Sequence, residues 1–300
     1  VKVDSQLQAG TLSMADRNIV LEDVYGDLSY RTDHGLRADA LSAQWFGKPV
    51  AIDVMTQSDG AMKIDMQGHV AMIDLKAWLR QPLFDFTSGD TPFTATLRLA
   101  GGASTLQVQS DLKGVSIDLP PPYNKVAEQA LPLVIDMSLG DTRNLVAALG
   151  EWADLHLRWL VADGAAAATK KSSEHAALLL DGGVLRLGRQ GKAEFGSGQF
   201  VITGAVSDVD LKAWGNTLRA RDEAGTNNSD EARSDLAVYL RELHFDSAQF
   251  AEQTLRDLIV SGRPSTTRLN PLPSFTPCRP HLLASTNFAR CGASVRPTSS

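Results

Sequence analysis

The chain contains residue types that could do chemistry, but their spacing matches none of the standard catalytic or metal-binding patterns. The six histidines are scattered, and none belongs to the His-Glu-x-x-His pattern of a zinc protease. Gly196 and Gly198 flank Ser197, yet no Gly-x-Ser-x-Gly elbow, P-loop or dinucleotide fingerprint occurs. We therefore expect no enzymatic activity, no metal site and no cofactor.

One pair of acidic residues could be read as a carboxylate pair for acid–base catalysis. Asp53 and Asp65 fall on adjacent predicted strands, as two such carboxylates would have to. Each of them alternates with apolar residues, however, so their side chains are expected on the solvated side of a sheet. The sequence favours a structural role for both.

The better candidates are apolar residues in short runs with a period of two. Side chains of a strand point alternately to its two sides, so each run gives one apolar and one polar face. An apolar face of this size binds an apolar ligand unless the protein itself covers it. The candidate lining residues are Val50, Ile52, Val54, Met62, Ile64, Met66, Leu97, Leu99, Leu106, Val108, Leu133, Ile135, Met137, Phe200 and Ile202. For each single position, ordinary packing between strands is an equal alternative.

These runs must be positioned by a sheet. About 14 candidate strands are separated by turn signals such as Ser58-Asp59-Gly60, which is typical of a meander of antiparallel hairpins. A helix is expected at residues 74–79, and residues 236–241 fit either a helix or a strand. The sheet could be a sandwich, a closed barrel or an open trough, and the pattern alone does not choose among them.

An internal repeat divides the chain. Residues 68–78 and 204–214 share a Gly, a Val and the block Asp-Leu-Lys-Ala-Trp without a gap. We expect a corner between a strand and a helix in both copies, in which Trp78 and Trp214 pack against the edge of the core. The functional alternative is that these two tryptophans touch a ligand. The repeat also predicts an array of similar modules.

The predicted modules follow from the repeat and from composition. They are a first β-groove module at residues 1–80, a second at 81–215, a polar mobile insertion at 216–234, the start of a further module at 235–261, and a disordered tail at 262–300.

Charge and cysteine usage exclude some functions. The formal net charge is −6, and the tail contributes five arginines and no acidic residue, so the remainder is still more acidic. Such a body offers no basic stripe for nucleic acid. Both cysteines, Cys278 and Cys291, lie in the tail, so no disulfide framework is expected elsewhere. The chain opens on Val1 without a targeting segment, and we expect it to be an interior piece of a longer protein.

Several segments together resemble one bacterial family. Residues 110–125 contain the Ser-x-Leu-x-Gly and Leu-Pro-x-Pro patterns followed by a Lys, and residues 19–28, 35–38 and 46–50 are also similar to that family. The chain thus resembles the YhdP family, relatives of AsmA and TamB, over about residues 1–260. The matching motifs are structural and point to no catalytic residue.

The resemblance implies an elongated, curved antiparallel β-sheet that forms a groove, with a few short helices. It also implies a periplasmic location, a tether to the inner membrane through a segment outside this chain, and phospholipid acyl chains as the ligand. The expected function is a section of a path that carries phospholipid between the inner and outer membranes of a Gram-negative bacterium. Membrane components at both ends of the full-length protein would be its partners. The alternative is a structural or adhesive β-protein without a lipid ligand.

Overall fold

The computed structural model describes residues 1–14, 19–79, 82–140, 142–161, 178–188, 194–224, 236–250 and 252–262. These residues form a sheet of 15 strands with the α-helices α1 and α2, which confirms the prediction of a mostly-β fold with few helices. The strands are β1 (Lys2–Met14), β2 (Ile19–Arg31), β3 (Gly35–Trp45), β4 (Lys48–Thr56), β5 (Met62–Ala71), β6 (Thr87–Leu99), β7 (Thr105–Ser110), β8 (Val115–Ile117), β9 (Leu133–Ser138), β10 (Thr142–Leu149), β11 (Ala153–Val161), β12 (Leu178–Leu187), β13 (Gln199–Asp210), β14 (Ala237–Phe250) and β15 (Gln253–Gly262). The helices are α1 (Met72–Leu79), α2 (Leu211–Ala224) and the 3-10 turns η2 (Pro82–Phe86) and η3 (Gly101–Ala103).

The strands follow one another in a nearly sequential order. Hydrogen-bonded neighbours run from β1 to β7, then from β9 to β15, and β8 pairs with β6 beside the main path. The order has two ends among the described strands, so the sheet is open. The helix expected at residues 74–79 is confirmed by α1.

The chain divides into two compact units, which we describe separately. Unit 1 comprises Val1–Asp118, Lys125–Glu151 and Leu155–Leu180, and unit 2 comprises Leu119–Asn124, Trp152–Asp154 and Asp181–Ser300. The modules expected at residues 1–80 and 81–215 stay a prediction.

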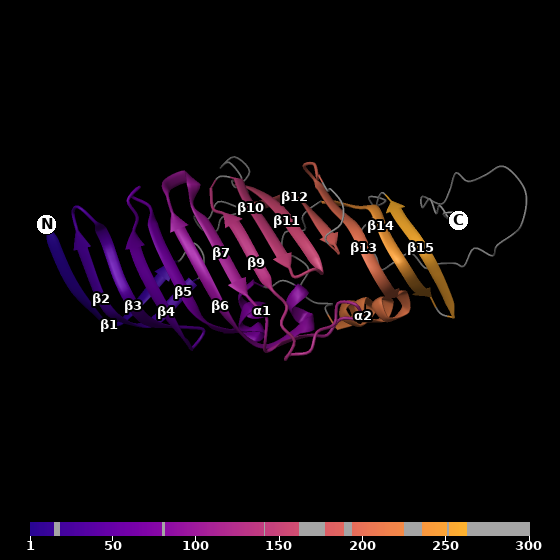
Figure 1. Cartoon of the computed structure of the whole chain (residues 1–300), viewed down its shortest axis with the longest axis horizontal. Helices are drawn as coiled ribbons and strands as arrows, with labels where there is room; N and C mark the ends of the chain where they lie inside the picture. The colour runs from indigo at the N-terminus through magenta and orange to yellow at the C-terminus, as the bar shows by residue number, and fades with distance from the viewer. Residues whose placement is uncertain are drawn as a thin grey trace, which may run out of the picture. The chain divides into compact units, whose positions relative to one another are not determined.

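Unit 1 is a ribbon of antiparallel strands that lie side by side (Figure 1). The β4–β5 hairpin illustrates why these residues form it. Thr56 pairs with Met62 across the turn, and the Gln57 amide donates to the Ala61 carbonyl at 2.7 Å. The turn contains Gly60 at a φ of 81°, a conformation that L-residues other than glycine rarely adopt. The turn signal read from the sequence therefore sets the register of this hairpin.

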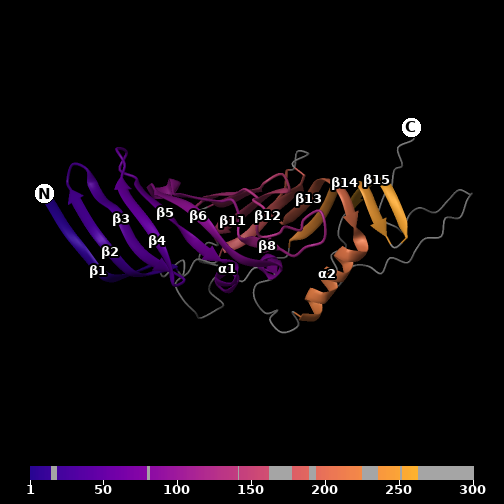
Figure 2. The same ribbon diagram turned by 60° about the horizontal axis from the view of Figure 1, so that its bottom comes forward.

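The core of unit 1 lies at the end of the strands where α1 packs. Helix α1 contacts β5, β6 and η2 there, and Figure 2 shows it at the ends of these strands. Trp45, Val70, Met72 and Phe93 are buried at this end. We call this end of the sheet the helix edge, and the opposite end, at the β4–β5 turn, the turn edge.

Unit 2 differs from the antiparallel meander that the sequence predicts. Strands β12 and β13 are parallel, and so are β13 and β14, whereas β14 and β15 are antiparallel. A parallel neighbour requires a connection that returns along the length of the strand, and α2 is part of that connection between β13 and β14. Val206, Val209, Leu243 and Ala248 form a buried cluster in this unit.

Two further expectations are corrected or resolved here. The polar mobile insertion expected at residues 216–234 stays a prediction, and its first residues belong to α2, which ends at Ala224. Residues 225–234 lie outside the described residues, as does the predicted tail from residue 263 onward. Of the ambiguous residues 236–241, residues 237–241 form the start of β14 rather than a helix. None of the described helices is long and apolar enough to cross a membrane.

The internal repeat forms the corner predicted from the sequence. In the first copy β5 leads into α1, and in the second β13 leads into α2. Trp78 lies edge-on to Trp45 with ring centroids 5.8 Å apart. Trp214 lies edge-on to Tyr123 at 6.1 Å, and its Nε1 donates to the Pro121 carbonyl at 3.4 Å. Both tryptophans thus pack against aromatic neighbours at the end of their strand.

Candidate functional site

The register of unit 1 places the candidate lining residues on one face of the sheet. In an antiparallel pair, residues directly opposite each other share a face. Ile64 lies opposite Val54 on one side and opposite Leu97 on the other, and Leu97 lies opposite Leu106. Met137 continues the same row on β9. We call this row of five residues the middle row.

The other candidates of unit 1 extend the same face on both sides of the middle row. Met62 lies opposite Leu99 next to the turn edge. Toward the helix edge, the candidates are Ile52, Met66, Val108 and Ile135 in one row, and Val50 and Leu133 in the next. We call the surface formed by all these residues the apolar face.

Phe200 and Ile202 belong to unit 2 and are not part of the apolar face. They pair with Gly183 and Leu185 of β12 on one side and with Val238 and Leu240 of β14 on the other. Ile202 packs against the buried cluster of that unit. Its contacts are therefore those of an ordinary core residue.

Exposure on the apolar face increases from the helix edge to the turn edge. Val50 and Ile52 are only 3% and 4% exposed, so the protein's own atoms occupy the face near the helix edge. The middle row is partly exposed, and Leu99 at the turn edge reaches 37%. In the part of the chain that the structure describes, the contacts of α1 are with β5, β6 and η2, and with Trp45 at the end of β3. The half of the face toward the turn edge is thus apolar and accessible.

An aromatic cluster packs at the helix edge. It consists of Trp45 and Phe46 from the β3–β4 hairpin, Trp78 from α1 and Phe93 from β6. The ring centroids of Trp45 and Phe93 are 5.5 Å apart, and those of Phe46 and Trp78 are 6.1 Å apart. Such tilted contacts are the geometry that aromatic pairs prefer. Trp45 and Phe93 of this cluster are buried, whereas Phe46 is 37% exposed.

The opposite face of the same strands is polar. Lys63 and Arg98 lie opposite each other there, and Asp65 lies opposite both Asp53 and Thr96. The Lys63 ammonium donates to Asp65 at 2.6 Å, and the Thr96 hydroxyl donates to the same carboxylate at 2.6 Å. Although desolvation raises the pKa of Asp65, these hydrogen bonds from Lys63 and Thr96 bring it below its ordinary value. The sheet therefore has one apolar and one charged face.

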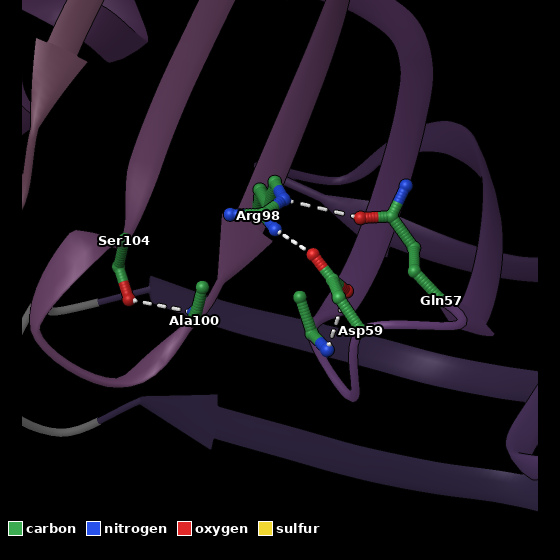
Figure 3. Close-up of polar contacts among 6 residues, drawn as sticks. Gln57, Asp59, Arg98, Ala100 and Ser104 are labelled. Atoms are coloured by element: carbon green, nitrogen blue, oxygen red, sulfur yellow. Dashed lines mark hydrogen bonds and ion pairs between the residues drawn. The ribbon is translucent and has the colours of Figure 1, made fainter.

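The turn edge carries charged and polar groups from β6 and from two turns (Figure 3). The Arg98 Nε donates to the Gln57 side chain at 3.1 Å, and its Nη2 forms an ion pair with Asp59. The Ala61 amide donates to the Asp59 carboxylate at 3.0 Å. On the neighbouring connection, the Ala100 amide donates to the Ser104 hydroxyl at 3.2 Å. The accessible half of the apolar face thus ends at a charged edge.

The suspected carboxylate pair has structural partners. Asp53 and Asp65 are direct neighbours across β4 and β5. Asp53 accepts a hydrogen bond from the Ala40 amide at 2.7 Å, and Asp65 is held by Lys63 and Thr96. The described part of the chain contains no cluster of His, Cys, Asp and Glu that could hold a metal ion. Both carboxylates are thus engaged in contacts within the sheet.

Period-two alternation in the sequence does not identify every residue of the apolar face. Leu145, Ala147 and Leu149 of β10 lie opposite Met137, Ile135 and Leu133, on the same face. The residues between them, Val146 and Ala148, are also apolar, so the run lacks the alternation that marks a two-faced strand. Phe93 and Ala95 on β6 were missed as well. Extending the alternation of Leu97 and Leu99 backward along β6 would have found both.

A comparison with known families agrees with these observations. A family model described as YhdP protein matches residues 1–270. No curated protein and no solved structure matches the chain. The match covers most of the 300 residues and includes all strands described above. The resemblance inferred from residues 110–125 and the upstream segments is confirmed, and the chain belongs to the YhdP family.

Proposed function

We propose that the apolar face binds the acyl chains of phospholipid, and that this chain is a section of a hydrophobic path for lipid between two membranes. The observation that carries the proposal is the partly exposed middle row, a continuous strip of aliphatic side chains across β4, β5, β6, β7 and β9. Membership of the YhdP family supports the lipid as ligand and a location in the bacterial envelope.

The mechanism follows from the chemistry of the face. Each buried methylene of an acyl chain contributes about 0.8 kcal/mol, so contact with a few aliphatic side chains holds a lipid without a specific pocket. The rows offer nearly equivalent apolar positions from strand to strand, so a chain can shift by one strand, about 4.8 Å, with little change in energy. No group on the face supplies a driving force, so the direction of movement comes from elsewhere.

The periplasm is the proposed location, with a tether to the inner membrane in a segment outside this chain. Components of the inner and outer membranes would meet the two ends of the full-length protein. No enzymatic step is part of the proposal.

Native mass spectrometry of the purified full chain tests the binding step. We expect phospholipid to copurify and Leu106→Asp to lose most of it, because a carboxylate in the middle row repels an acyl chain. The matched control is Thr105→Asp, which places the same charge one residue away on the polar face. Circular dichroism checks that both variants fold. A lipid-free wild type that also excludes added phospholipid would favour a structural β-protein instead.

A further inference from the structure

Arg143 on β10 is a charged residue on the apolar face. Leu145 of the same strand lies opposite Met137, the β9 residue of the middle row. Side chains of a strand alternate between its two faces, so Arg143, two residues before Leu145, lies on the same face. The Asn144 amide between them donates to the Ser138 hydroxyl of β9 at 2.9 Å, so the two strands are still in contact at this point. Arg143 is therefore placed one row beyond the middle row, toward the turn edge.

The row that contains Arg143 is otherwise apolar or uncharged. On β5 and β6 it contains Met62 and Leu99, which lie opposite each other. After β9 it continues with Leu139, whose amide donates to the Ser104 carbonyl at 2.8 Å. From β4 to β10, the other described residues in this row, in the middle row and in the two rows toward the helix edge carry no charge. Arg143 is thus the single charged group within these four rows of the apolar face.

The guanidinium of Arg143 has an unused hydrogen-bond donor. Its Nε is buried and has no hydrogen-bond partner in the part of the chain that the structure describes. Buried donors without an acceptor are rare in folded proteins, because the loss of water is normally compensated by another partner. The side chain as a whole is partly exposed, so a ligand on the face can contact the guanidinium. A cation of this kind on an apolar surface favours an anionic ligand.

Arg98 provides a contrast at the same edge of the sheet. It lies on the polar face, where its Nε donates to the Gln57 side chain at 3.1 Å and its Nη2 forms an ion pair with Asp59. The protein itself therefore supplies the partners of Arg98, whereas the Nε of Arg143 has none among the described residues. The two arginines differ in their face and in their partners, which makes Arg98 a matched control for Arg143.

The distance between Arg143 and the middle row fits the structure of a phospholipid. Successive residues of a strand rise by about 3.4 Å, so Arg143 follows Leu145 along the face at about 7 Å. In a phospholipid only the glycerol separates the acyl esters from the phosphate. A lipid whose chains contact Leu145 and Met137 can therefore place its phosphate beside Arg143. The planar guanidinium can donate to two phosphate oxygens at once.

We propose that Arg143 binds the phosphate of a lipid whose acyl chains lie on the middle row, so that this section selects lipids with a phosphate over neutral lipids with the same chains. The inference rests on the proposed binding of acyl chains to the apolar face. It adds the residue that recognises the headgroup and the side of the face on which the headgroup lies.

The test is competition between a lipid with a phosphate and a lipid without one. The purified full chain is incubated with vesicles of phosphatidylglycerol that contain a minor share of diacylglycerol with the same acyl chains. Mass spectrometry then quantifies the lipids extracted from the re-isolated protein. We expect the bound ratio of phosphatidylglycerol to diacylglycerol to exceed that of the vesicles about ten-fold, the contribution of one hydrogen bond to a charged group.

Two variants locate this preference on the protein. Arg143→Met keeps an apolar stem and should return the bound ratio to that of the vesicles, and Arg143→Gln is a second neutral variant with the same expected result. Arg98→Met makes the same change on the polar face and should leave the enrichment intact. Circular dichroism checks that all variants fold.

The inference is overturned by a wild-type ratio equal to that of the vesicles, or by an equal loss of enrichment in Arg98→Met. It is also overturned if Arg143→Met binds less of both lipids at an unchanged ratio, because Arg143 would then act through its stem alone. Inorganic phosphate added to the lipid-free protein tests for a free-anion site, and a phosphate adduct that depends on Arg143 without any lipid preference would exclude the headgroup. A wild type that binds neither lipid contradicts the proposed function itself, so the two failures are distinguishable.

Discussion

At the scale of single residues, Lys125 shows how the segment at residues 110–125 is held in place. Its side chain is buried, with 3% exposure. The ammonium donates to the carbonyls of Leu112 at 2.8 Å, Val115 at 2.5 Å and Val126 at 3.2 Å, so each of its three protons has an acceptor. Burial lowers the pKa of Lys125, and the charges of Asp111 and Glu128 oppose this shift. The lysine in the family-like motif is therefore a structural group.

Replacement of this lysine should destabilise unit 1. Lys125→Met removes a donor from three carbonyls, of which those of Leu112 and Val126 keep a backbone amide donor and that of Val115 loses its side-chain donor. We expect a loss of about 2 kcal/mol in the free energy of unfolding. The matched control is Lys113→Met in the same segment, where the exposed side chain makes the expected change less than about 0.5 kcal/mol. Urea unfolding followed by tryptophan fluorescence measures both. Equal stability of the two variants would show that the buried ammonium contributes nothing.

Asp53 stabilises an irregularity of the neighbouring strand. The pairing of β3 with β4 shifts between Ala38 and Leu41, and Ala40 in this bulge has a φ of 54°. The Ala40 amide lies in this bulge, outside the regular pairing of β3 with β4, and it donates its hydrogen bond to the Asp53 carboxylate instead. We expect Asp53→Ala to reduce the free energy of unfolding by about 1 kcal/mol, and Asp53→Asn to retain most of it because the amide oxygen can accept the same bond. Thermal unfolding of the two variants compares them, and an Asn variant as unstable as the Ala variant would contradict this role.

At the scale of elements, each copy of the repeat requires its glycine, Gly68 in the first and Gly204 in the second, because a side chain there would meet the neighbouring strand. A Cβ on Gly68 would lie 2.7 Å from the Val50 side chain and 3.1 Å from the Pro49 carbonyl. Gly204 has a φ of 117°, and a Cβ there would overlap the Leu187 carbonyl oxygen. In both copies the glycine lets the neighbouring strand approach closely before the corner. The sequence identity of the copies thus reflects a shared packing requirement.

The glycine requirement gives a direct test in unit 2. Gly204→Ala should destabilise the unit by about 3 kcal/mol, because both the φ angle and the Leu187 backbone oppose a side chain. The control is Gly215→Ala in α2, where no atom lies within 4 Å of the added carbon. That change should be neutral or stabilise the helix by up to about 1 kcal/mol. The melting temperature should fall for Gly204→Ala and stay the same or rise for Gly215→Ala. An equal fall in both variants would contradict the requirement for glycine at position 204.

The sequence predicts the elements well where one local rule applies. Period-two alternation and turn residues predict the hairpins of unit 1, and the repeat predicts the positions of α1 and the start of α2. It fails for the parallel strands of unit 2, because strand direction depends on the path of the connections rather than on the side-chain pattern. Residues 216–224 have a polar composition that is typical of a loop, but they form the continuation of α2.

At the scale of the whole molecule, the sequence predicts which residues share a face but not how much of that face is free. Alternation assigns Ile52 and Ile64 to the same face, and the register confirms that they lie in neighbouring rows. Ile52 is buried whereas Ile64 is partly exposed, and burial of this kind depends on contacts between residues far apart in the chain, such as Trp45 with Phe93. Local patterns contain no information about such long-range packing. The accessible strip therefore becomes visible only in the folded protein.

Because Ile52 is buried and Ile64 is partly exposed, one matched pair of variants can distinguish an effect on lipid binding from an effect on folding. Ile52→Asp places a carboxylate in packed protein and should unfold unit 1, because an unpaired buried charge costs several kcal/mol. Ile64→Asp places the same charge in the partly exposed middle row, where water can reach it, so the sheet should remain folded while bound phospholipid falls. Near-ultraviolet circular dichroism reports the fold, and native mass spectrometry reports the lipid. If Ile64→Asp unfolds the protein as completely as Ile52→Asp, the middle row is a sealed core rather than a binding surface. If both variants fold and retain lipid, the ligand lies elsewhere, and the apolar face does not bind the acyl chains.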